Sequence, residues 1–246
     1  QKGIIRFEAP EGIVVEPSTI PYHFIDSSGE FKIQIKIKSL IKNNRLEEIK
    51  ILNNGEKLFT HSTIKYNHIP WQNVLIPSKI KASALDLKIK NKRIAYINGA
   101  GDYIDEALIK MGYTVDLIPS SNLNLVNNKN YDVLVFGIRA LNNQEDLTNC
   151  KESIVNFAKN GGKVIFQYNT AHELVTQDFV PGEFKISRDR VTNEKAEVRI
   201  LQAKHPVFHQ PNKIESSDFN DWVQERGLYF PNTYDNTYEE LLSMND

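Results

Sequence analysis

Cysteine, long apolar runs and an excess of either charge are all scarce in this sequence. The single cysteine, Cys150, excludes an intramolecular disulfide and a cysteine-rich zinc site. No run of 18 apolar residues occurs, so the sequence predicts no membrane-spanning helix. The 246 residues carry 30 Lys and Arg against 31 Asp and Glu, a formal net charge of -1. This balance argues against a protein that coats nucleic acid or acidic membranes.

Several motifs of cofactor binding are also missing. The turn at residues 99–101 supplies two glycines of a dinucleotide fingerprint, but Ile104 stands where the third would be, and no Walker motif occurs. No HExxH motif occurs either, and Pro206 disfavours a helix that would bring His205 and His209 onto one face. The sequence therefore predicts no nucleotide site, no metal site and no cofactor in this chain.

Residues 1–91 carry the period-two alternation of β-strands. Segments 31–38 and 85–90 alternate apolar and polar side chains, which is typical of a strand with one buried and one solvated face. A strong turn signal at 53–55 separates two further strand-like segments. Several short strands spaced by turns predict an immunoglobulin-like β-sandwich, and we expect its lysines on the solvated faces.

The near-zero net charge hides an asymmetry along the chain. Residues 1–92 hold 15 Lys and Arg against 9 Asp and Glu, whereas residues 93–246 hold 15 against 22. Opposite charges in two regions indicate two folding units. We therefore predict a β-sandwich accessory domain over 1–91 and an α/β domain over 92–246. Because the sequence starts without a signal-peptide pattern and ends abruptly, we also expect it to be a piece of a longer protein.

The second region alternates apolar strands with amphipathic helices. Continuous apolar runs predict parallel strands that are buried on both faces, and glycines follow the two expected helices. In chain order the expected elements are strand 94–97, helix 104–111, strand 113–118, strand 132–136, helix 146–160 and strand 163–168. This rhythm predicts an open, mostly parallel, doubly wound α/β sheet of the glutamine amidotransferase-like or flavodoxin-like kind.

Polar residues follow three of these strands, at the edge where open α/β sheets bind ligands. Guanidinium and amide groups at such an edge suit a carboxylate, a phosphate or a sugar hydroxyl. The candidate ligand-binding residues on this rim are Gly99, Gly101, Asp102, Arg139, Asn142, Gln167 and Asn169. The alternative is that these polar groups only cap helices and bond to loop backbone.

Two charged loop segments extend the candidate rim. Segment 187–192 places two arginines around an aspartate, and segment 222–231 places an ion pair among large apolar and aromatic side chains. The candidates from these loops are Arg188, Arg190, Glu225 and Arg226. The alternative is a structural network of arginines and carboxylates that packs the loop-rich end against the sheet.

A nucleophile is missing where related sheets carry one. Amidotransferase-like and hydrolase-like sheets place Cys or Ser on the sharp turn after the third strand, and here that turn carries Arg139. Cys150 falls in the following helix, where a buried structural thiol is expected. No Cys/His or Ser/His arrangement can be assembled, so we assign no catalytic residue.

Segments spread over the second region resemble the C-terminal region of long bacterial PIG-L/LmbE-type N-acetylglucosaminyl deacetylase-like proteins. The segments are 92–102, 137–140, 167–170, 187–191, 222–231 and 242–246. The resemblance runs over most of 92–246, and residues 1–91 match more loosely, as the β-sandwich linker of such proteins. The second domain also resembles glutamine amidotransferase-like and ThuA-like folds.

The resemblance implies a parent enzyme that uses zinc to remove N-acetyl groups from glucosamine-type sugars, and a periplasmic or secreted location. The zinc site of that family lies in an N-terminal catalytic domain with an AHPDD-like motif, which this sequence lacks. No zinc or catalytic residue therefore carries over. What the resemblance implies for this chain is a non-catalytic accessory portion that binds carbohydrate or positions the N-terminal catalytic domain of the parent chain.

Two other functions stay open at this point. The ThuA-like domain could have its own sugar-directed activity, with Asp102, Glu225 or His205 as a general base whose pKa is tuned by burial or by a neighbour. The third function is purely structural, an interaction scaffold. The charge balance predicts no nucleic-acid partner in any of the three cases.

Overall fold

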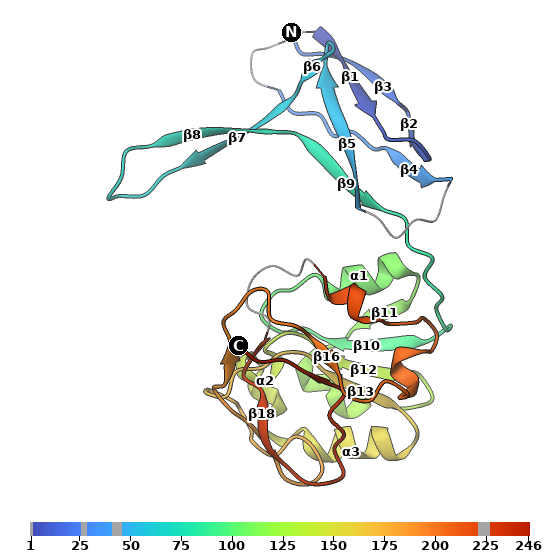
Figure 1. Ribbon diagram of the computed structural model, residues 1–246, viewed down its shortest axis with the longest axis vertical. Helices are drawn as coiled ribbons and strands as arrows, with labels where there is room; N and C mark the ends of the chain where they lie inside the picture. The colour runs from blue at the N-terminus through green and yellow to red at the C-terminus, as the bar shows by residue number, and fades with distance from the viewer. Residues whose placement is uncertain (1, 26–28, 41–45, 221–226) are drawn as a thin grey trace. The chain divides into compact units, whose positions relative to one another are not determined.

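The computed structural model describes residues 2–25, 29–40, 46–220 and 227–246. The chain divides into two compact units, Gln1–Asp86 and Leu87–Asp246, and each is described by itself (Figure 1). The division therefore falls just before the boundary that the sequence predicts after residue 91. Both units consist mainly of short β-strands, and the described helices are short.

The N-terminal unit is built from antiparallel strands. Its described strands are β1 (Lys2–Glu8), β2 (Ile13–Glu16), β3 (Thr19–His23), β4 (Lys36–Ser39), β5 (Leu46–Asn53), β6 (Glu56–Lys57), β7 (Phe59–Ile64), β8 (Gln72–Pro77) and β9 (Lys79–Ser83). One sheet has the order β3-β1-β5-β6, with β9 also paired to β5, while β2–β4 and β7–β8 form separate two-stranded pairs.

Period-two alternation explains the core of this unit. Ile5 and Phe7 of β1 and Ile49 of β5 point to the same buried side and pack with Ile13 and Val15 of β2. Their neighbours along β1 and β5 are exposed, and all of these except Ile4 are polar. The turn between β5 and β6 places two successive residues in the left-handed region, which asparagine and glycine tolerate best. This unit therefore folds around one small apolar cluster.

The immunoglobulin-like β-sandwich predicted for residues 1–91 is wrong. The described strands form one five-stranded antiparallel sheet and two isolated pairs, not two packed sheets of the expected kind. Segment 31–38 was expected as one strand, but only its end belongs to β4, and segment 85–90 contains no strand. Alternation of apolar and polar residues indicates which side chains would share a face if the segment were a strand. A strand forms only where its backbone N–H and C=O groups also find hydrogen-bond partners on another strand.

The C-terminal unit begins with alternating strands and helices and ends in short paired strands. Its described elements are β10 (Arg93–Ile97), α1 (Ile104–Met111), β11 (Thr114–Leu117), η1 (Ser120–Leu125), β12 (Val133–Phe136), α2 (Ala140–Asn143), η2 (Glu145–Asn149), α3 (Lys151–Lys159), β13 (Lys163–Phe166), β14 (Phe184–Ile186), β15 (Arg190–Val191), β16 (Arg199–Ile200), η3 (Pro206–Phe208), η4 (Ser216–Phe219), β17 (Gly227–Leu228), β18 (Pro231–Tyr234) and β19 (Leu242–Ser243).

A four-stranded parallel sheet of order β11-β10-β12-β13 holds the core of this unit. On one face, Leu134 and Phe136 of β12 pack with Ile154 and Phe157 of α3. On the other face, Tyr96 of β10 lies in a second apolar cluster that also includes part of α1. Burial on both faces explains why these strands read as continuous apolar runs.

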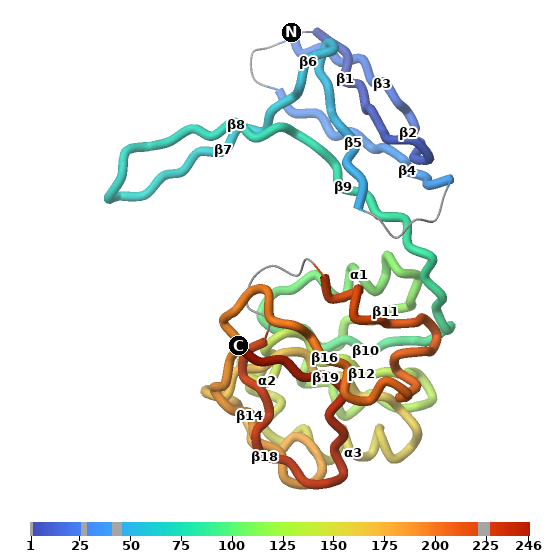
Figure 2. The backbone as a smooth tube through the Cα atoms, viewed as in Figure 1, coloured from blue at the N-terminus to red at the C-terminus, as the bar shows by residue number. Residues whose placement is uncertain are grey.

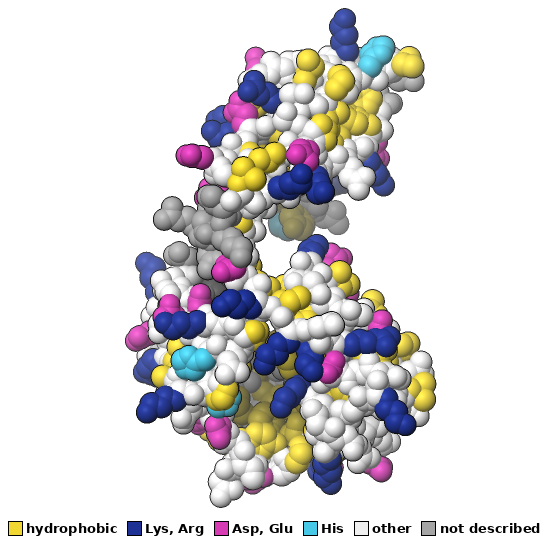
Figure 3. Space-filling model, turned by 90° about the vertical axis from the view of Figure 1, so that its right-hand side faces the viewer, with side chains coloured by type: hydrophobic (Ala, Val, Ile, Leu, Met, Phe, Trp, Pro, Cys, Tyr) yellow, Lys and Arg dark blue, Asp and Glu magenta, His cyan; other side chains and the backbone are white. Residues whose placement is uncertain are grey.

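The polypeptide after β13 forms three two-stranded antiparallel pairs among its described residues, β14–β18, β15–β17 and β16–β19. Each joins segments that lie far apart in the sequence, and Figure 2 shows β16 and β19 side by side. Figure 3 shows that hydrophobic side chains line a hollow on one face of this unit. The described residues after β13 are therefore held together by these three short strand pairs.

The doubly wound α/β domain predicted for residues 92–246 is also wrong. The parallel sheet is small, with strands of four or five residues, and the described part of 167–246 adds no further parallel strand. A doubly wound sheet grows by repeated strand–helix units, and that repetition stops at Phe166. The remaining described strands pair antiparallel, two by two, with partners from distant parts of the sequence. Within the described ranges, no helix combines the length and the apolar character that crossing a bilayer requires.

We expect Leu134→Ala to destabilise the C-terminal unit by about 2–5 kcal/mol, because Leu134 is 0% exposed and its loss would leave a cavity between sheet and helix. Leu125, which is 63% exposed, is the matched control, and Leu125→Ala should change stability by less than about 0.5 kcal/mol. Urea unfolding followed by circular dichroism measures both. Equal effects for the two variants would contradict this assignment of the core.

Candidate functional site

The carboxyl ends of β10, β12 and β13 are joined by a hydrogen-bond network around Asp102. The Tyr96 hydroxyl donates to Asp102 Oδ1 at 2.6 Å and accepts from Gln167 Nε2 at 2.9 Å. The same Oδ1 accepts from the backbone N–H of Ile104 at 3.0 Å, at the start of α1, and Oδ2 accepts from the N–H of Ile138 at 3.1 Å, after β12. One carboxylate thus fixes the loops at the end of the sheet.

Electrostatics support a structural role for this network. Burial, reinforced by the adjacent Asp102 carboxylate, raises the pKa of Tyr96 far above its ordinary value, so its hydroxyl stays protonated as a donor. Burial also raises the pKa of Asp102, but the hydrogen bonds from Tyr96, Ile104 and Ile138 outweigh it and bring the pKa below its ordinary value. An ionised carboxylate with three donors aimed at it is a poor general base.

Close backbone contact explains the glycines of the rim better than ligand binding does. A Cβ on Gly99 would lie 1.9 Å from the carbonyl oxygen of Ile138, and a Cβ on Gly137 would lie 2.9 Å from the Gly99 nitrogen. The N–H of Ala100 donates to the Ile138 oxygen at 2.7 Å. Gly101 faces open space, but its φ of 87° favours glycine. The loops after β10 and β12 therefore touch and leave no room there.

The two asparagines of the rim bond to loop backbone. Asn169 is 5% exposed, accepts from the N–H of Leu141 at 3.1 Å and donates to the Gln167 carbonyl at 2.8 Å. Asn142 accepts from the N–H of Thr170 at 3.0 Å and donates to the His172 carbonyl at 2.9 Å. These amides tie the loop after β13 to α2, and they keep little hydrogen-bonding capacity for a ligand.

Arg139 carries a buried donor that no described residue satisfies. Its φ of 57° places it in the left-handed region, which costs a non-glycine residue about 1–2 kcal/mol. Its N–H donates to the Tyr168 carbonyl at 2.7 Å, so it lies beside the segment after β13. Its buried Nε has no hydrogen-bond partner, and no described carboxylate pairs with its guanidinium. Buried donors in proteins nearly always have a hydrogen-bond acceptor, so this Nε is a candidate to bind one from a ligand.

A cleft of about 550 Å³ opens at the end of β13. Gln167, Tyr168 and Asn169 form one side of it, and segment 227–231 forms another. The remaining lining residues are Phe166, Phe179, Val180, Phe184, Ile186 and Tyr238. Two residues predicted from the sequence, Gln167 and Asn169, line this cleft, whereas the other rim residues lie outside its lining.

Aromatic side chains dominate the cleft, and sequence reasoning assigned them no binding role. The ring of Tyr229 lies 5.9 Å from that of Tyr168 and 5.7 Å from that of His172, and its hydroxyl lies 3.5 Å from His172 Nδ1. Further ring contacts lead from Phe184 to Tyr238, at 5.3 Å. The density of aromatic residues from 228 to 238 is the sequence signal that could have identified this surface. The candidate rim includes only segment 222–231 of that stretch.

The charged loop candidates fall in different places. Arg190 begins β15, where it pairs with Leu228 of β17 beside the cleft, and Arg188 is exposed just before it. Glu225 and Arg226 lie outside the described residues. His205 caps η3, where its Nδ1 accepts from the N–H of Val207 at 3.2 Å, and it lines none of the described cavities. Among the described residues, therefore, no catalytic partner lies beside Arg188, Arg190 or His205.

Metal and thiol chemistry have no visible site in the described part of the chain. No group of three His, Cys, Asp or Glu side chains there is arranged to hold a metal ion. Cys150 is 3% exposed at the start of α3, and burial raises the pKa of its thiol to about 11. Its position matches the buried structural thiol that the sequence predicts.

Two comparisons with known proteins gave no match. No protein-family model matches the chain. No curated protein matches it either. The resemblance to PIG-L/LmbE-type proteins therefore rests on the sequence segments alone, and the function has to be argued from the site.

We expect the stabilising effect of Asp102 to depend on pH. Its folded pKa is below the unfolded value of about 3.9, so its contribution is complete above that value and is lost as the pH falls through the folded pKa. Asp102→Asn should cost roughly 1–3 kcal/mol at pH 6, and the gap to wild type should shrink below about pH 3. Denaturant unfolding at both pH values measures it. Exposed Glu152→Gln is the control, and a gap that does not change with pH would contradict the network.

We expect Cys150 to be inert in the native protein. At pH 8 only roughly one thiol in a thousand would be ionised, and burial keeps reagents out. Ellman's reagent should therefore label the folded protein over hours and the guanidinium-unfolded protein within seconds to minutes. Fast stoichiometric labelling of the folded protein would show that Cys150 is accessible and activated.

Proposed function

We propose that this chain is a non-catalytic, carbohydrate-binding accessory portion of a PIG-L/LmbE-type deacetylase-like protein. The observation that carries the proposal is the cleft of about 550 Å³ at the end of β13, which combines aromatic rings with the amide of Gln167. Clefts of this size are typical of small-ligand sites, which are largely apolar with a few placed polar groups. In the parent chain such a module would bind the sugar polymer or position the N-terminal catalytic domain.

Sugar rings match the chemistry of this cleft. One face of a pyranose carries C–H groups and packs well on an aromatic ring, whereas its edge carries hydroxyls that both donate and accept hydrogen bonds. Tyr168 and Tyr229 supply rings at the mouth of the cleft, and Gln167 supplies an amide. Arg139 lies outside the described lining but is held beside Tyr168 by its backbone, and we expect its Nε, which donates to no described residue, to donate to a hydroxyl or a carboxylate of the ligand.

Binding is a better account of this cleft than catalysis is. Its described lining contains no Asp, Glu, Cys or His. Of the candidate bases of the sequence analysis, Asp102 is ionised and accepts from three donors of the protein itself. Hydrolysis of a glycosidic bond ordinarily requires a pair of carboxyl groups at the sugar.

We expect Tyr168→Ala to weaken saccharide binding about tenfold, because it removes an aromatic surface worth roughly 1–1.5 kcal/mol. Arg139→Ala should weaken binding by a similar factor through the loss of a donor. A panel of saccharides screened by thermal shift, followed by calorimetric titration of the hits, measures both. The same panel, assayed for released sugar, tests for activity of the chain's own.

Tyr103→Ala is the matched control, since Tyr103 is 76% exposed at the start of α1 and lines none of the described cavities. It should bind saccharides as wild type does. If no saccharide stabilises the wild-type protein, or if all three variants bind alike, the cleft is not a sugar site and the scaffold function is the better account.

A further inference from the structure

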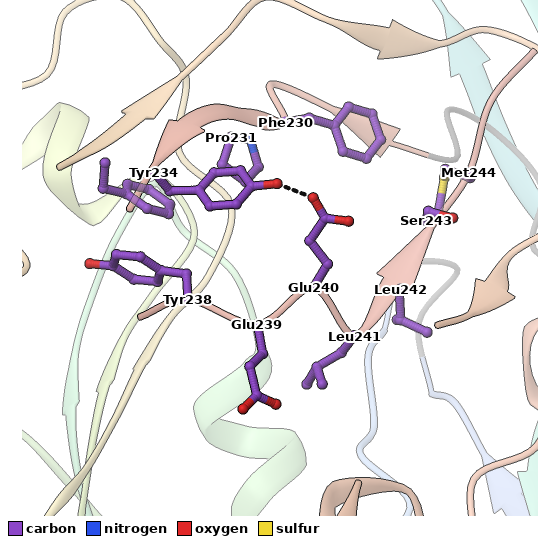
Figure 4. A pocket seen from close by; sticks show the side chains of 11 residues that line it. Phe230, Pro231, Tyr234, Tyr238, Glu239, Glu240, Leu241, Leu242, Ser243 and Met244 are labelled. Atoms are coloured by element: carbon purple, nitrogen blue, oxygen red, sulfur yellow. Dashed lines mark hydrogen bonds between the residues drawn. The ribbon is translucent and has the colours of Figure 1, made fainter. Parts of the chain in front are cut away.

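A second cavity adjoins the cleft and shares its aromatic wall. It measures about 340 Å³ and is formed by β18, the turn after it and segment 239–244 (Figure 4). The residues that line both cavities are Phe184, Phe230, Pro231 and Tyr238. Because these four residues belong to both linings, the two cavities lie next to each other.

We propose that the C-terminal unit binds a linear oligosaccharide, with one sugar in the cleft and the next in this second cavity, which accepts neutral or basic sugars and rejects acidic ones. The proposal rests on the carbohydrate-binding function proposed above and names the class of its ligand. The second cavity, at about 340 Å³, is at the small end of the range for ligand sites and suits a single ring, whereas the cleft, at about 550 Å³, lies well within that range.

The walls of the second cavity are fixed by backbone pairing and by a tight turn. β18 pairs with β14, and β19 pairs with β16, so the two sides of the cavity are anchored to different parts of the unit. Between them, Asp235 Oδ1 accepts from the N–H of Thr237 at 2.9 Å. The rings of Tyr234 and Tyr238 lie 6.4 Å apart, edge to face, and the Tyr238 hydroxyl donates to the Pro181 carbonyl. A preformed aromatic surface of this kind binds with little loss of side-chain entropy.

The charge in the second cavity is of one sign. Glu239 and Glu240 lie on its lining, and the described lining contains no Lys, Arg or His. The Tyr234 hydroxyl donates to Glu240 Oε1, which orients the carboxylate, as Figure 4 shows. Glu240 Oε2 takes no hydrogen bond from a described residue, so it can accept from a hydroxyl or an ammonium group. A sugar carboxylate placed here would meet like charge with no compensating cation.

This arrangement predicts how ligand length and charge should affect binding to the full chain. We would titrate the protein with glucose, cellotetraose, a glucosamine tetramer and a galacturonate tetramer by calorimetry. The neutral and basic tetramers should bind at least tenfold more tightly than glucose, and the acidic tetramer should bind at least tenfold more weakly than the neutral one.

Substitutions in the lining of the second cavity test whether it contributes to oligosaccharide binding. Glu240→Gln should reduce the preference of the basic over the acidic tetramer about tenfold and leave glucose binding unchanged. Tyr234→Phe should weaken tetramer binding severalfold, because it releases the orienting hydrogen bond while keeping the ring. Glu197→Gln, at an exposed position outside the lining, is the matched control and should bind all four probes as wild type does. Unfolding midpoints verify that each variant folds.

The outcomes separate this inference from the function on which it rests. If glucose and the tetramers bind alike, and Glu240→Gln and Tyr234→Phe change nothing, the second cavity is not a subsite although the cleft still binds sugar. Preference for the acidic tetramer would overturn the assigned charge selectivity. If none of the four probes binds, both proposals are wrong.

Discussion

The carboxylate of Asp102 is the constraint on which the C-terminal unit depends. It receives hydrogen bonds from Tyr96 in β10, from the start of α1 and from the loop after β12, and Tyr96 in turn holds Gln167 after β13. Each partner comes from a different loop or strand. Without this anion, three polar groups would lose their acceptor in a partly buried position, which is costly. The network thus uses polar groups to hold the edge of the sheet together.

The cleft lies between the end of the parallel sheet, on one side, and the loops and short strand pairs that follow β13, on the other. Rings in contact lead outward from Phe136 in β12 through Phe166 to Phe179 and Phe184. The short ladders after β13 then place Tyr229 and Tyr238 against this surface. Four residues of this packed surface line both cavities.

The sequence predicted local elements better than their assembly. Helix 104–111 coincides with α1, the apolar run 94–97 lies within β10, and the run 132–136 contains β12. Helix 146–160 was too long, since Glu145–Asn149 is a 3-10 turn that precedes α3. Of the rim candidates, Gln167 and Asn169 reached the cleft, while Gly99 and Asp102 proved to hold loops together. Residue type cannot tell a polar group that binds a ligand from one that satisfies backbone, because both need the same hydrogen bonds.

The sequence by itself determined which segments are strands and helices in the first half of the C-terminal unit, that Cys150 is buried, and that charge divides unequally along the chain. These properties follow from side-chain periodicity and composition, which are local. Only the tertiary structure decided that the parallel sheet stops at four strands and that residues 227–244 return to form the cleft. Strand pairing between distant segments depends on which backbone groups find partners, and no local pattern in the sequence encodes that choice.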